Sequence, residues 1–417
     1  MSEPDGQFDV AIVGAGMVGQ ACALALANPV EGPKLRVALI DGRDPAGFSR
    51  PGFDPRASAV TATSRVMLEV LGVWPALGAH AQEMREIKVT DSRPGAAARP
   101  ALLYFGAAPN GRPSSAHMVE NVHIYGALYV CLSACENVSL HPGVKVAHVD
   151  FSGPQARLAL EDGRVVAAPL VVAADGRRSP VRAQAGIETV GWSYPQHGIV
   201  TTVCHARAHD GIAEEHFLPA GPFAILPLTG NRSSLVWTED ADEAERLVAG
   251  PDDVFAAEMT RRFGDHLGAV TPVGPRVSFP LSMFLARDYV APRLALVGDA
   301  AHSVHPIAGL GFNLGLRDAA ALADVVSDHV GLGLDIGSLA ALGDYQADRR
   351  FDNALVAFAT DGLNRLFSND NAALRAVRDI GLTMVDRADP IKRFFMDQAA
   401  GRHAGLPRLM RGRAVRQ

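Results

Sequence analysis

The sequence predicts an α/β protein of two or three domains, in which a parallel βαβ region is combined with a later antiparallel sheet. A chain of 417 residues is too long for one ordinary hydrophobic core. Residues 8–41 contain two apolar, β-branched segments separated by a helix-forming segment, which is the pattern of a βαβ unit. Residues 198–206 and 223–238 alternate between apolar and polar side chains, as antiparallel strands do.

The composition excludes several classes of protein. Hydrophobic residues make up 48% of the chain and charged residues 20%, which excludes wholesale disorder. The formal net charge of −6 argues against a nucleic-acid binder with a broad basic face. The four cysteines include no C-x-x-C pair, so we expect a reducing, cytoplasmic location rather than a disulfide scaffold. The acidic first residues lack the basic and apolar regions of a secretory signal.

The first motif directly follows the strand predicted at residues 8–13. Gly14, Gly16 and Gly19 form a G-x-G-x-x-G pattern, and a helix-forming segment comes after it. Gly14 allows the tight turn, Gly16 lets backbone N–H groups approach a pyrophosphate, and Gly19 lets the helix pack closely on the strand. The N-terminus of the helix then presents unpaired N–H groups to the anion.

The second predicted strand, residues 35–40, ends on Asp41, about 20 residues after Gly19. A carboxylate there can accept hydrogen bonds from both ribose hydroxyls of an adenosine, each worth about 1.5–3 kcal/mol. The strand, the glycines, the helix and the acid in this order predict a dinucleotide site. The alternative is an ordinary βαβ unit with an acidic surface turn. This pattern alone does not distinguish FAD from NAD.

Two later segments repeat the arrangement of an apolar strand that ends in an acidic turn. Residues 170–174 lead into Asp175, for which a solvated turn is the alternative interpretation. Residues 293–297 lead into Asp299, and a Pro/Gly-rich loop then opens a helix at residues 311–313. Asp299 can accept hydrogen bonds from sugar-alcohol hydroxyls, and the N-terminus of the helix suits the negative charge of a reduced flavin. These two segments favour FAD over NAD.

Together, these motifs resemble those of the single-component FAD-dependent aromatic hydroxylases, and more narrowly the UbiH-type hydroxylases of ubiquinone biosynthesis. The resemblance covers nearly the whole chain, through residues 14–19, 56–59, 70–74, 174–176, 221–228, 236–238, 298–318, 348–353 and 366–368. Leu310 stands where family members often carry glutamine, which puts in doubt a polar side chain over the flavin ring. Arg178 stands where the family usually has asparagine.

The resemblance implies a Rossmann-like FAD-binding domain with an inserted antiparallel-sheet substrate domain and C-terminal helices. The expected bounds are 1–80, 114–185 and 281–339 for the FAD-binding domain, 81–113 and 186–280 for the substrate domain, and 340–417 for the C-terminal helical segment with its basic tail. Within the substrate domain, the Pro/Gly/Ala-rich residues 94–113 are expected to form a loop. A helix is expected at residues 121–136.

The resemblance also implies which residues form the site. The expected cofactor contacts are Gly14, Gly16, Gly19, Asp41, Arg56, Asn121, Asp175, Asp299, Gly311, Phe312 and Asn313. Arg56 would contact the pyrophosphate, and Asn121 has a role as helix N-cap as its alternative. His305 and Pro306 would lie near the reactive edge of the flavin, where His305 either handles a proton or forms a structural hydrogen bond. His302 is expected to be structural, and no metal site is expected.

The implied activity is hydroxylation of the aromatic ring of a prenylated ubiquinone precursor with O2 and reduced flavin. The chain has no second G-x-G-x-x-G pattern, so NAD(P)H bound transiently or an electron-transfer protein must supply the electrons. Other ubiquinone-biosynthesis proteins are further candidate partners. Two alternatives stay open: a hydroxylase of a small water-soluble phenol, and a non-catalytic flavin-binding scaffold. Residues 399–417 carry five arginines and no acid, which fits either a solvated tail or a weak contact with anionic lipid at the inner face of the membrane.

Overall fold

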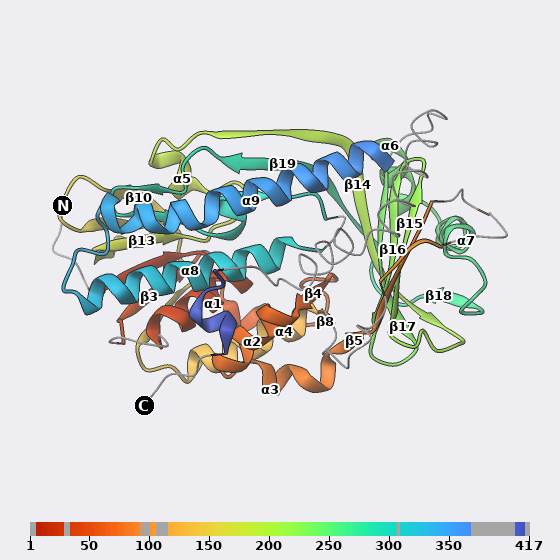
Figure 1. Ribbon diagram of the computed structural model, residues 1–417, viewed down its shortest axis with the longest axis horizontal. Coiled ribbons are helices and arrows are strands. Elements are labelled where there is room, and N and C mark those ends of the chain that lie inside the picture. Colours follow the sequence, from red (N-terminus) through yellow and green to blue (C-terminus); the bar gives the residue numbers. More distant parts are fainter. Residues whose placement is uncertain are drawn as a thin grey trace.

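The computed structural model describes residues 6–28, 34–91, 95, 101–105, 116–306, 309–367 and 405–412. A parallel sheet with its helices occupies one end of the molecule, and a large antiparallel sheet occupies the other (Figure 1). Two long helices, α8 (Gly311–Gly331) and α9 (Leu339–Phe367), pack on each other. Helix α9 reaches from the first region to the second (Figure 1).

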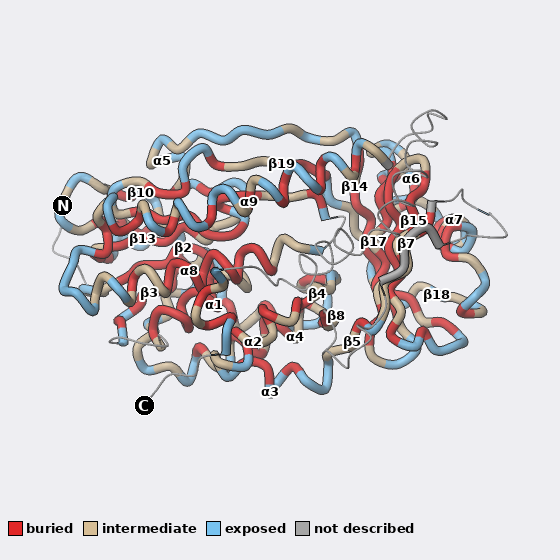
Figure 2. The backbone as a smooth tube through the Cα atoms, viewed as in Figure 1, coloured by how far each residue is buried: buried red, intermediate tan, exposed pale blue. Residues whose placement is uncertain are grey.

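Among the described residues, this sheet has six strands in the order β20-β21-β13-β2-β3-β9, which are parallel except for the edge strand β20, antiparallel to β21. Their bounds are β2 (Val10–Val13), β3 (Val37–Asp41), β9 (Val138–Pro142), β13 (Leu170–Ala173), β20 (Val290–Ala291) and β21 (Leu294–Leu296). All residues of β2, β13 and β21 are buried, as Figure 2 shows in red. Strands covered on both faces need apolar side chains at every position, which explains why these segments are continuously apolar. The predicted βαβ unit is confirmed.

Helices and smaller sheets surround the parallel sheet. Helix α1 (Met17–Ala27) packs against α4 (Asn121–Ser133) and α8, and its small alanine side chains permit this close contact. The remaining elements of this region are α2 (Ala62–Val70), α3 (Trp74–Leu77), α5 (Pro180–Gln184), a four-stranded sheet of β1 (Gly6–Gln7), β12 (Val165–Ala168), β11 (Ala156–Leu160) and β10 (Val146–Asp150), and a three-stranded sheet of β4 (Ala57–Thr61), β8 (Ala116–Glu120) and β5 (Gln82–Met84).

The large sheet has nine strands, mostly antiparallel, which confirms the antiparallel sheet predicted from the alternating segments. Its strands, in spatial order, are β22 (His302–Ser303), β19 (Val277–Ala286), β14 (Thr189–His205), β17 (Arg232–Asp240), β16 (Gly221–Leu228), β15 (Ile212–Leu218), β6 (Glu86–Asp91) and β7 (Ala101–Phe105), while β18 (Val270–Pro272) pairs with β14.

The two faces of the large sheet have different partners. Helices α6 (Ala241–Ala249) and α7 (Asp252–Phe263) cover one face, where Trp237 and Phe223 pack against Phe255. We call the opposite face the inner face. On it, Ala213 packs with Met118 of the three-stranded sheet, so the inner face meets the region that holds the parallel sheet.

Three boundaries differ from expectation. Residues 101–105 were expected within a loop, but they form strand β7, because an apolar segment flanked by Pro/Gly-rich sequence can still pair with β6. The expected helix at 121–136 ends at Ser133. Strand β19 crosses the predicted domain boundary at residue 280, since it pairs with β14 along most of its length. The division into domains stays a prediction. Most of the expected C-terminal segment, residues 368–404 and 413–417, lies outside the described residues.

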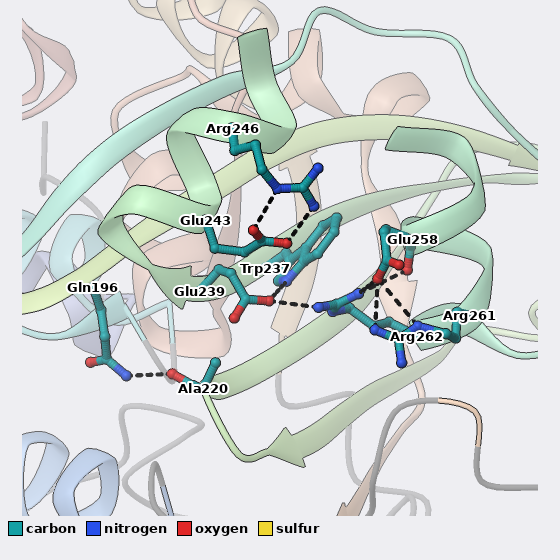
Figure 3. A network of polar contacts seen from close by, with 9 residues as sticks. All are labelled: Gln196, Ala220, Trp237, Glu239, Glu243, Arg246, Glu258, Arg261 and Arg262. Carbon is teal, nitrogen blue, oxygen red and sulfur yellow. Dashed lines mark hydrogen bonds and ion pairs between the residues drawn. The ribbon is translucent and has the colours of Figure 1, made fainter. Parts of the chain in front are cut away.

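A buried ion-pair network joins the large sheet to α7 (Figure 3). The Arg262 side chain is only 7% exposed and donates to the Glu239 carboxylate at 2.8 Å. Its guanidinium lies 4.4 Å from the centre of the Trp237 ring, and the Trp237 indole N–H donates to the same Glu239 carboxylate at 3.0 Å. Arg262 also contacts Glu258, which Arg261 contacts from the exposed side.

Arg262→Leu is expected to lower the free energy of unfolding by about 3–5 kcal/mol, because it leaves the buried Glu239 carboxylate without its counter-charge. Arg261→Leu is the matched control, since Arg261 pairs with Glu258 but is half exposed, and we expect a loss within about 1 kcal/mol. Urea titration followed by circular dichroism measures both values. Equal losses in the two variants would contradict the importance of burial at Arg262.

Candidate cofactor site

The predicted site residues follow four neighbouring parallel strands. The strands β21, β13, β2 and β3 are adjacent, and Leu296, Ala173, Val13 and Ile40 are aligned across them. Because the carboxyl ends of parallel strands meet at one edge of a sheet, the turns that follow these strands lie side by side. Backbone hydrogen bonds continue across this edge, from Ala174 N to Val13 O at 2.8 Å and from Gly14 N to Ile40 O at 2.8 Å. The edge therefore carries Gly14, Asp41, Asp175 and Asp299.

The glycine turn between β2 and α1 has the geometry that its sequence predicts. Gly14 has φ of +105°, and a Cβ added to it would lie 2.3 Å from the carbonyl oxygen of Ala174. A Cβ at Gly19 would lie 1.9 Å from the carbonyl oxygen of Gly14. Beyond its chain neighbours, a Cβ added at Gly16, the residue that precedes α1, has no atom of the described residues within 4 Å. The N-terminus of α1 therefore faces open space, where a phosphate can reach its N–H groups.

Two single-methyl substitutions are expected to separate folding from binding in this turn. Gly19→Ala should lower the free energy of unfolding by about 3 kcal/mol or more, because the new methyl group collides with backbone. Gly16→Ala should stay within about 0.5 kcal/mol, because its methyl group meets no protein atom. It should weaken FAD binding about tenfold or more, because the methyl group occupies the approach to the helix N-terminus. Thermal unfolding and calorimetric titration with FAD measure the two effects, and tight FAD binding by Gly16→Ala would contradict the placement of the pyrophosphate.

Asp41 lies at the end of β3 with its carboxylate partly used. One carboxylate oxygen accepts the Ala15 N–H at 2.7 Å, and the other accepts the Arg43 N–H at 2.8 Å. Each oxygen retains acceptor capacity for a ribose hydroxyl. The guanidinium of Arg43 lies 4.8 Å from the Phe48 ring centre, and sequence reasoning did not select Arg43. A planar cation held on an aromatic ring beside Asp41 can stack on a nucleotide base.

Arg56 and Asn121 belong to one polar cluster. The buried Asp54 carboxylate accepts two hydrogen bonds from the Arg56 guanidinium, at 2.7 and 2.8 Å, and one from the Asn121 amide at 2.9 Å. The amide oxygen of Asn121 accepts the Ser58 hydroxyl at 2.7 Å. Asn121 is not the N-cap, because Glu120 occupies that position and Asn121 is the first helical residue of α4. The cluster holds the half-exposed Arg56 side chain in one orientation.

The two acidic turns differ in their exposure. One oxygen of Asp175 accepts the Val181 N–H at 3.2 Å, whereas the other is buried with no partner among the described residues. Burial raises the pKa of Asp175. Asp299 is exposed although Gly298 and Ala300 on either side are buried. The protein around this carboxyl group desolvates it and raises its pKa, which Arg56 and other nearby cations partly offset. Both carboxyl groups thus have acceptor atoms available for a ligand.

Asp318 is a residue of this site that sequence reasoning did not single out. It is fully buried in α8, and one of its oxygens accepts the Gly298 N–H at 3.0 Å and the His302 ring N–H at 2.6 Å. The other oxygen accepts Arg349 Nε and the Asn353 amide, each at 3.0 Å. These contacts agree with the structural role expected of His302. The four bonds to Asp318 hold the Gly298-Asp299 turn against α8 and α9.

The N-terminus of α8 faces the same edge with free backbone donors. The first turn, which includes Gly311 and Phe312, has N–H groups that no helical carbonyl can accept. The side-chain amide of Asn313 donates to Ala59 O at 2.7 Å and accepts from Thr61 N at 3.0 Å, so its polar atoms are already engaged. Asn313 therefore offers a ligand its backbone rather than its amide group.

His305 is completely buried, and neither ring nitrogen has a hydrogen-bond partner in the described part of the chain. Its ring meets Tyr194 edge-on, with ring centres 5.2 Å apart, and the Tyr194 hydroxyl donates to Asp361 of α9 at 2.7 Å. Burial lowers the pKa of His305 to about 4, so its imidazole is neutral near pH 7. Pro306 is exposed, and the neighbouring residues 307 and 308 lie outside the described residues. The roles of both residues stay predictions.

Two further features, a metal-binding cluster and a membrane-spanning helix, are absent from the described ranges. No group of three or more His, Cys, Asp or Glu side chains is arranged there to hold a metal ion. None of the helices in the described part of the chain has the length and apolarity needed to cross a membrane.

Comparison with known proteins identifies relatives along the whole chain. The family described as "FAD binding domain" matches residues 7–333, and the family described as "Squalene epoxidase" matches residues 276–396. The chain is 46% identical to the Ubiquinone hydroxylase UbiL of Rhodospirillum rubrum, over 97% of this chain and 92% of that protein. It is 38% identical to the 3-demethoxyubiquinol 3-hydroxylase of Escherichia coli, over 94% of this chain and 98% of that protein.

Solved structures share the fold. The p-nitrophenol 4-monooxygenase PnpA of Pseudomonas putida superimposes with a TM-score of 0.78 at 19% identity, covering 96% of this chain and 100% of that one. The family match over residues 7–333, most of the chain, shows that the cofactor is FAD. The chain belongs to the family of FAD-dependent aromatic-ring monooxygenases that includes the hydroxylases of ubiquinone biosynthesis.

Proposed function

We propose that this monooxygenase hydroxylates the aromatic ring of a prenylated ubiquinone precursor with O2 and reduced FAD. The observation that carries the proposal is the position of the inner face of the large sheet beside the edge that carries the acidic turns. The ring of Phe279, on the inner face, lies 5.2 Å from the guanidinium of Arg56. The relatives named as ubiquinone and demethoxyubiquinol hydroxylases support a substrate of this class.

The residues at the sheet edge fit FAD. The open space in front of Gly16 would take the pyrophosphate, and Asp41 would hold the adenosine ribose. The exposed carboxyl group of Asp299 and the unpaired oxygen of Asp175 would accept hydroxyl groups of the ribityl chain. The N-terminus of α8 would face the flavin ring. When bound, the flavin supplies the activation of O2, which no amino-acid side chain can perform.

The protein's own part is to bind the ring and exclude water. Strand alternation gives the inner face apolar side chains from three neighbouring strands, including Val200, Ala224 and Val236. Such a surface binds a prenyl tail and an aromatic ring through the hydrophobic effect. The neutral imidazole of His305 can donate or accept one hydrogen bond in a buried place, as a proton-handling group must.

The test is incorporation of labelled oxygen by the FAD-loaded protein. The protein is incubated with NAD(P)H, ¹⁸O₂ and either a short-chain prenylated phenol or the same phenol without its tail. We expect ¹⁸O in the ring of the prenylated compound and at least tenfold less in the other. Equal labelling of both would favour a hydroxylase of small phenols. Absence of labelling with NAD(P)H and with dithionite-reduced protein would favour a non-catalytic scaffold.

The electron donor, the partner proteins and the lipid contact are part of the same proposal. Electrons would come from NAD(P)H or an electron-transfer protein. Other ubiquinone-biosynthesis proteins would deliver the substrate or receive the hydroxylated product. For the basic C-terminus, weak contact with anionic lipid remains the proposal, although the Arg408 guanidinium already pairs with Asp328. The backbone N–H of Arg408 donates to the Asp324 carboxylate at 2.8 Å. Removal of residues 413–417 should weaken sedimentation with anionic liposomes, and unchanged sedimentation would exclude a role for these residues.

A further inference from the structure

Glu215 is a carboxyl group on the inner face of the large sheet. It lies in β15, where successive side chains point to opposite faces. Its neighbour Glu214 points toward α7, because its carboxylate contacts His266, just beyond α7, at 2.7 Å. His216 lies 3.2 Å from the same carboxylate. Glu215, between these two residues, therefore points to the inner face.

The surroundings of Glu215 on this face are apolar. Its cross-strand partners are Ala224 on β16 and Val89 on β6. Its neighbours on the same side of β15 are Ala213 and Phe217, both buried. Along the same row of the sheet, Ala224 is followed by Val236 and Val200. Within the described ranges, Glu215 is thus the ionisable member of a row of the sheet that is otherwise apolar.

Within the described ranges, the carboxyl group of Glu215 has no ion-pair or hydrogen-bond partner, and it is not sealed from solvent. It is partly exposed, while the protein around it desolvates it and raises its pKa to about 8. It is therefore mostly neutral near pH 7. A polar group in apolar surroundings without a partner is costly to the folded state, and a valine or leucine would avoid that cost. A ligand that hydrogen-bonds the group removes the penalty.

The position of Glu215 connects it with the cofactor edge. Ala213, two residues away on the same face, packs in a cluster with Met118 and Ala59. The carbonyl oxygen of Ala59 accepts the Asn313 amide at 2.7 Å, at the N-terminus of α8. The surface that carries Glu215 therefore continues directly to the helix end that would face the flavin.

We propose that the carboxyl group of Glu215 hydrogen-bonds the ring hydroxyl of the aromatic substrate and so orients the ring for reaction. This inference rests on the proposed function, because it requires a substrate that is a phenol with a hydrocarbon tail. Such a molecule has one polar end, and the otherwise apolar row that contains Glu215 offers that end a carboxyl group. A neutral carboxyl group carries one donor and one acceptor, which matches the one donor and the acceptor sites of a phenol hydroxyl. Glu215 is a positioning and specificity residue, and the chemistry of oxygen activation does not involve it.

The experiment is a thermodynamic cycle that combines substitutions at Glu215 with removal of the hydroxyl group from the ligand. Dissociation constants are measured by calorimetry for the FAD-loaded wild type, Glu215→Gln and Glu215→Leu. The two ligands are a short-chain prenylated phenol and its analogue with hydrogen in place of the hydroxyl. In the wild type, removal of the hydroxyl should weaken binding about tenfold, because Glu215 is then left without a partner in apolar surroundings. In Glu215→Leu the two ligands should bind within about twofold of each other, and Glu215→Gln should retain most of the difference.

Two controls accompany the measurement, and two outcomes would contradict the proposal. Glu245→Gln makes the same chemical change at an exposed position of α6, and its two dissociation constants should equal those of the wild type. Thermal unfolding should show that Glu215→Leu is at least as stable as the wild type, since leucine suits the apolar face. Equal effects of hydroxyl removal in the wild type and Glu215→Leu would overturn the role of Glu215 alone. Failure of the wild type to bind either prenylated ligand would overturn the proposed function, and the role of Glu215 with it.

Discussion

Asp299→Ala is expected to give a folded protein that purifies without the yellow colour of FAD. Asp299 follows β21 and is exposed at the edge where the turns of four parallel strands meet. Its carboxyl group makes no hydrogen bond to the protein within the described ranges, so its removal should cost the fold little. Each lost hydrogen bond between a charged carboxylate and a ribityl hydroxyl costs about 1.5–3 kcal/mol, which corresponds to a loss of FAD affinity of tenfold or more.

The measurement combines the absorbance ratio at 280 and 450 nm with calorimetric titration of FAD into the apoprotein. Asp299→Asn is the conservative comparison, because its amide oxygen still accepts a hydrogen bond while the charge is gone, and it should lie between the wild type and Asp299→Ala. Unfolding temperatures of all three proteins without FAD should agree. Stoichiometric FAD in purified Asp299→Ala would show that the ribityl chain does not lie at this turn.

The strand-end turns could be predicted from the sequence because their signals are local. A buried parallel strand is apolar at every position, and the turn after it shows glycine and aspartate where the backbone or a ligand requires them. Gly14 and Gly19 illustrate this, since both are required by contacts made within the same βαβ unit or with the adjacent strand end. The parallel order of the strands then brought the separate motifs to one edge.

The groups that hold those turns could not be predicted in the same way. Asp318 has an unremarkable place in a helical segment, and its importance comes from Arg349 and Asn353, which α9 brings to it from more than 30 residues away. Similarly, the sequence left Asn121 as either a cofactor contact or a helix N-cap. Its hydrogen bonds with Asp54 and Ser58 depend on where the fold places those two residues. The direction of Glu215 follows from the register of β15, which pairing with two other strands determines.

Asp318→Asn is expected to cause a loss of stability as large as that of Arg262→Leu. Burial by itself would raise the pKa of Asp318, but the neighbouring His302 and Arg349 charges and the hydrogen bonds hold it well below its usual value. The neutral amide has almost the same size but leaves the Arg349 guanidinium, which is 3% exposed, with Asp352 as its remaining ion-pair partner. Breaking a buried pair in this way costs about 3–5 kcal/mol. Urea titration of the FAD-free protein measures the loss.

The same substitution should also weaken FAD binding, although Asp318 would not touch the cofactor. One carboxylate oxygen accepts the Gly298 N–H and the His302 ring N–H, and an asparagine can keep these bonds only by turning its NH2 group, a donor, toward the Arg349 and Asn353 donors. The turn that carries Asp299 is then free to shift. Asp162→Asn is the matched control, since Asp162 pairs with Arg164 on the exposed surface, and it should change neither property.

The pH dependence gives an independent check on Asp318. A carboxyl group whose pKa is lower in the folded state stabilises the fold above its unfolded pKa of about 4, and that contribution is lost as the pH falls further. The difference in unfolding free energy between the wild type and Asp318→Asn should therefore be constant from about pH 7 to pH 5 and shrink below about pH 4. A difference that stays constant down to pH 3 would mean that folding does not lower the pKa of Asp318. In that case the bonds to Gly298 and His302, rather than the ion pair with Arg349, would hold the cofactor turn in place.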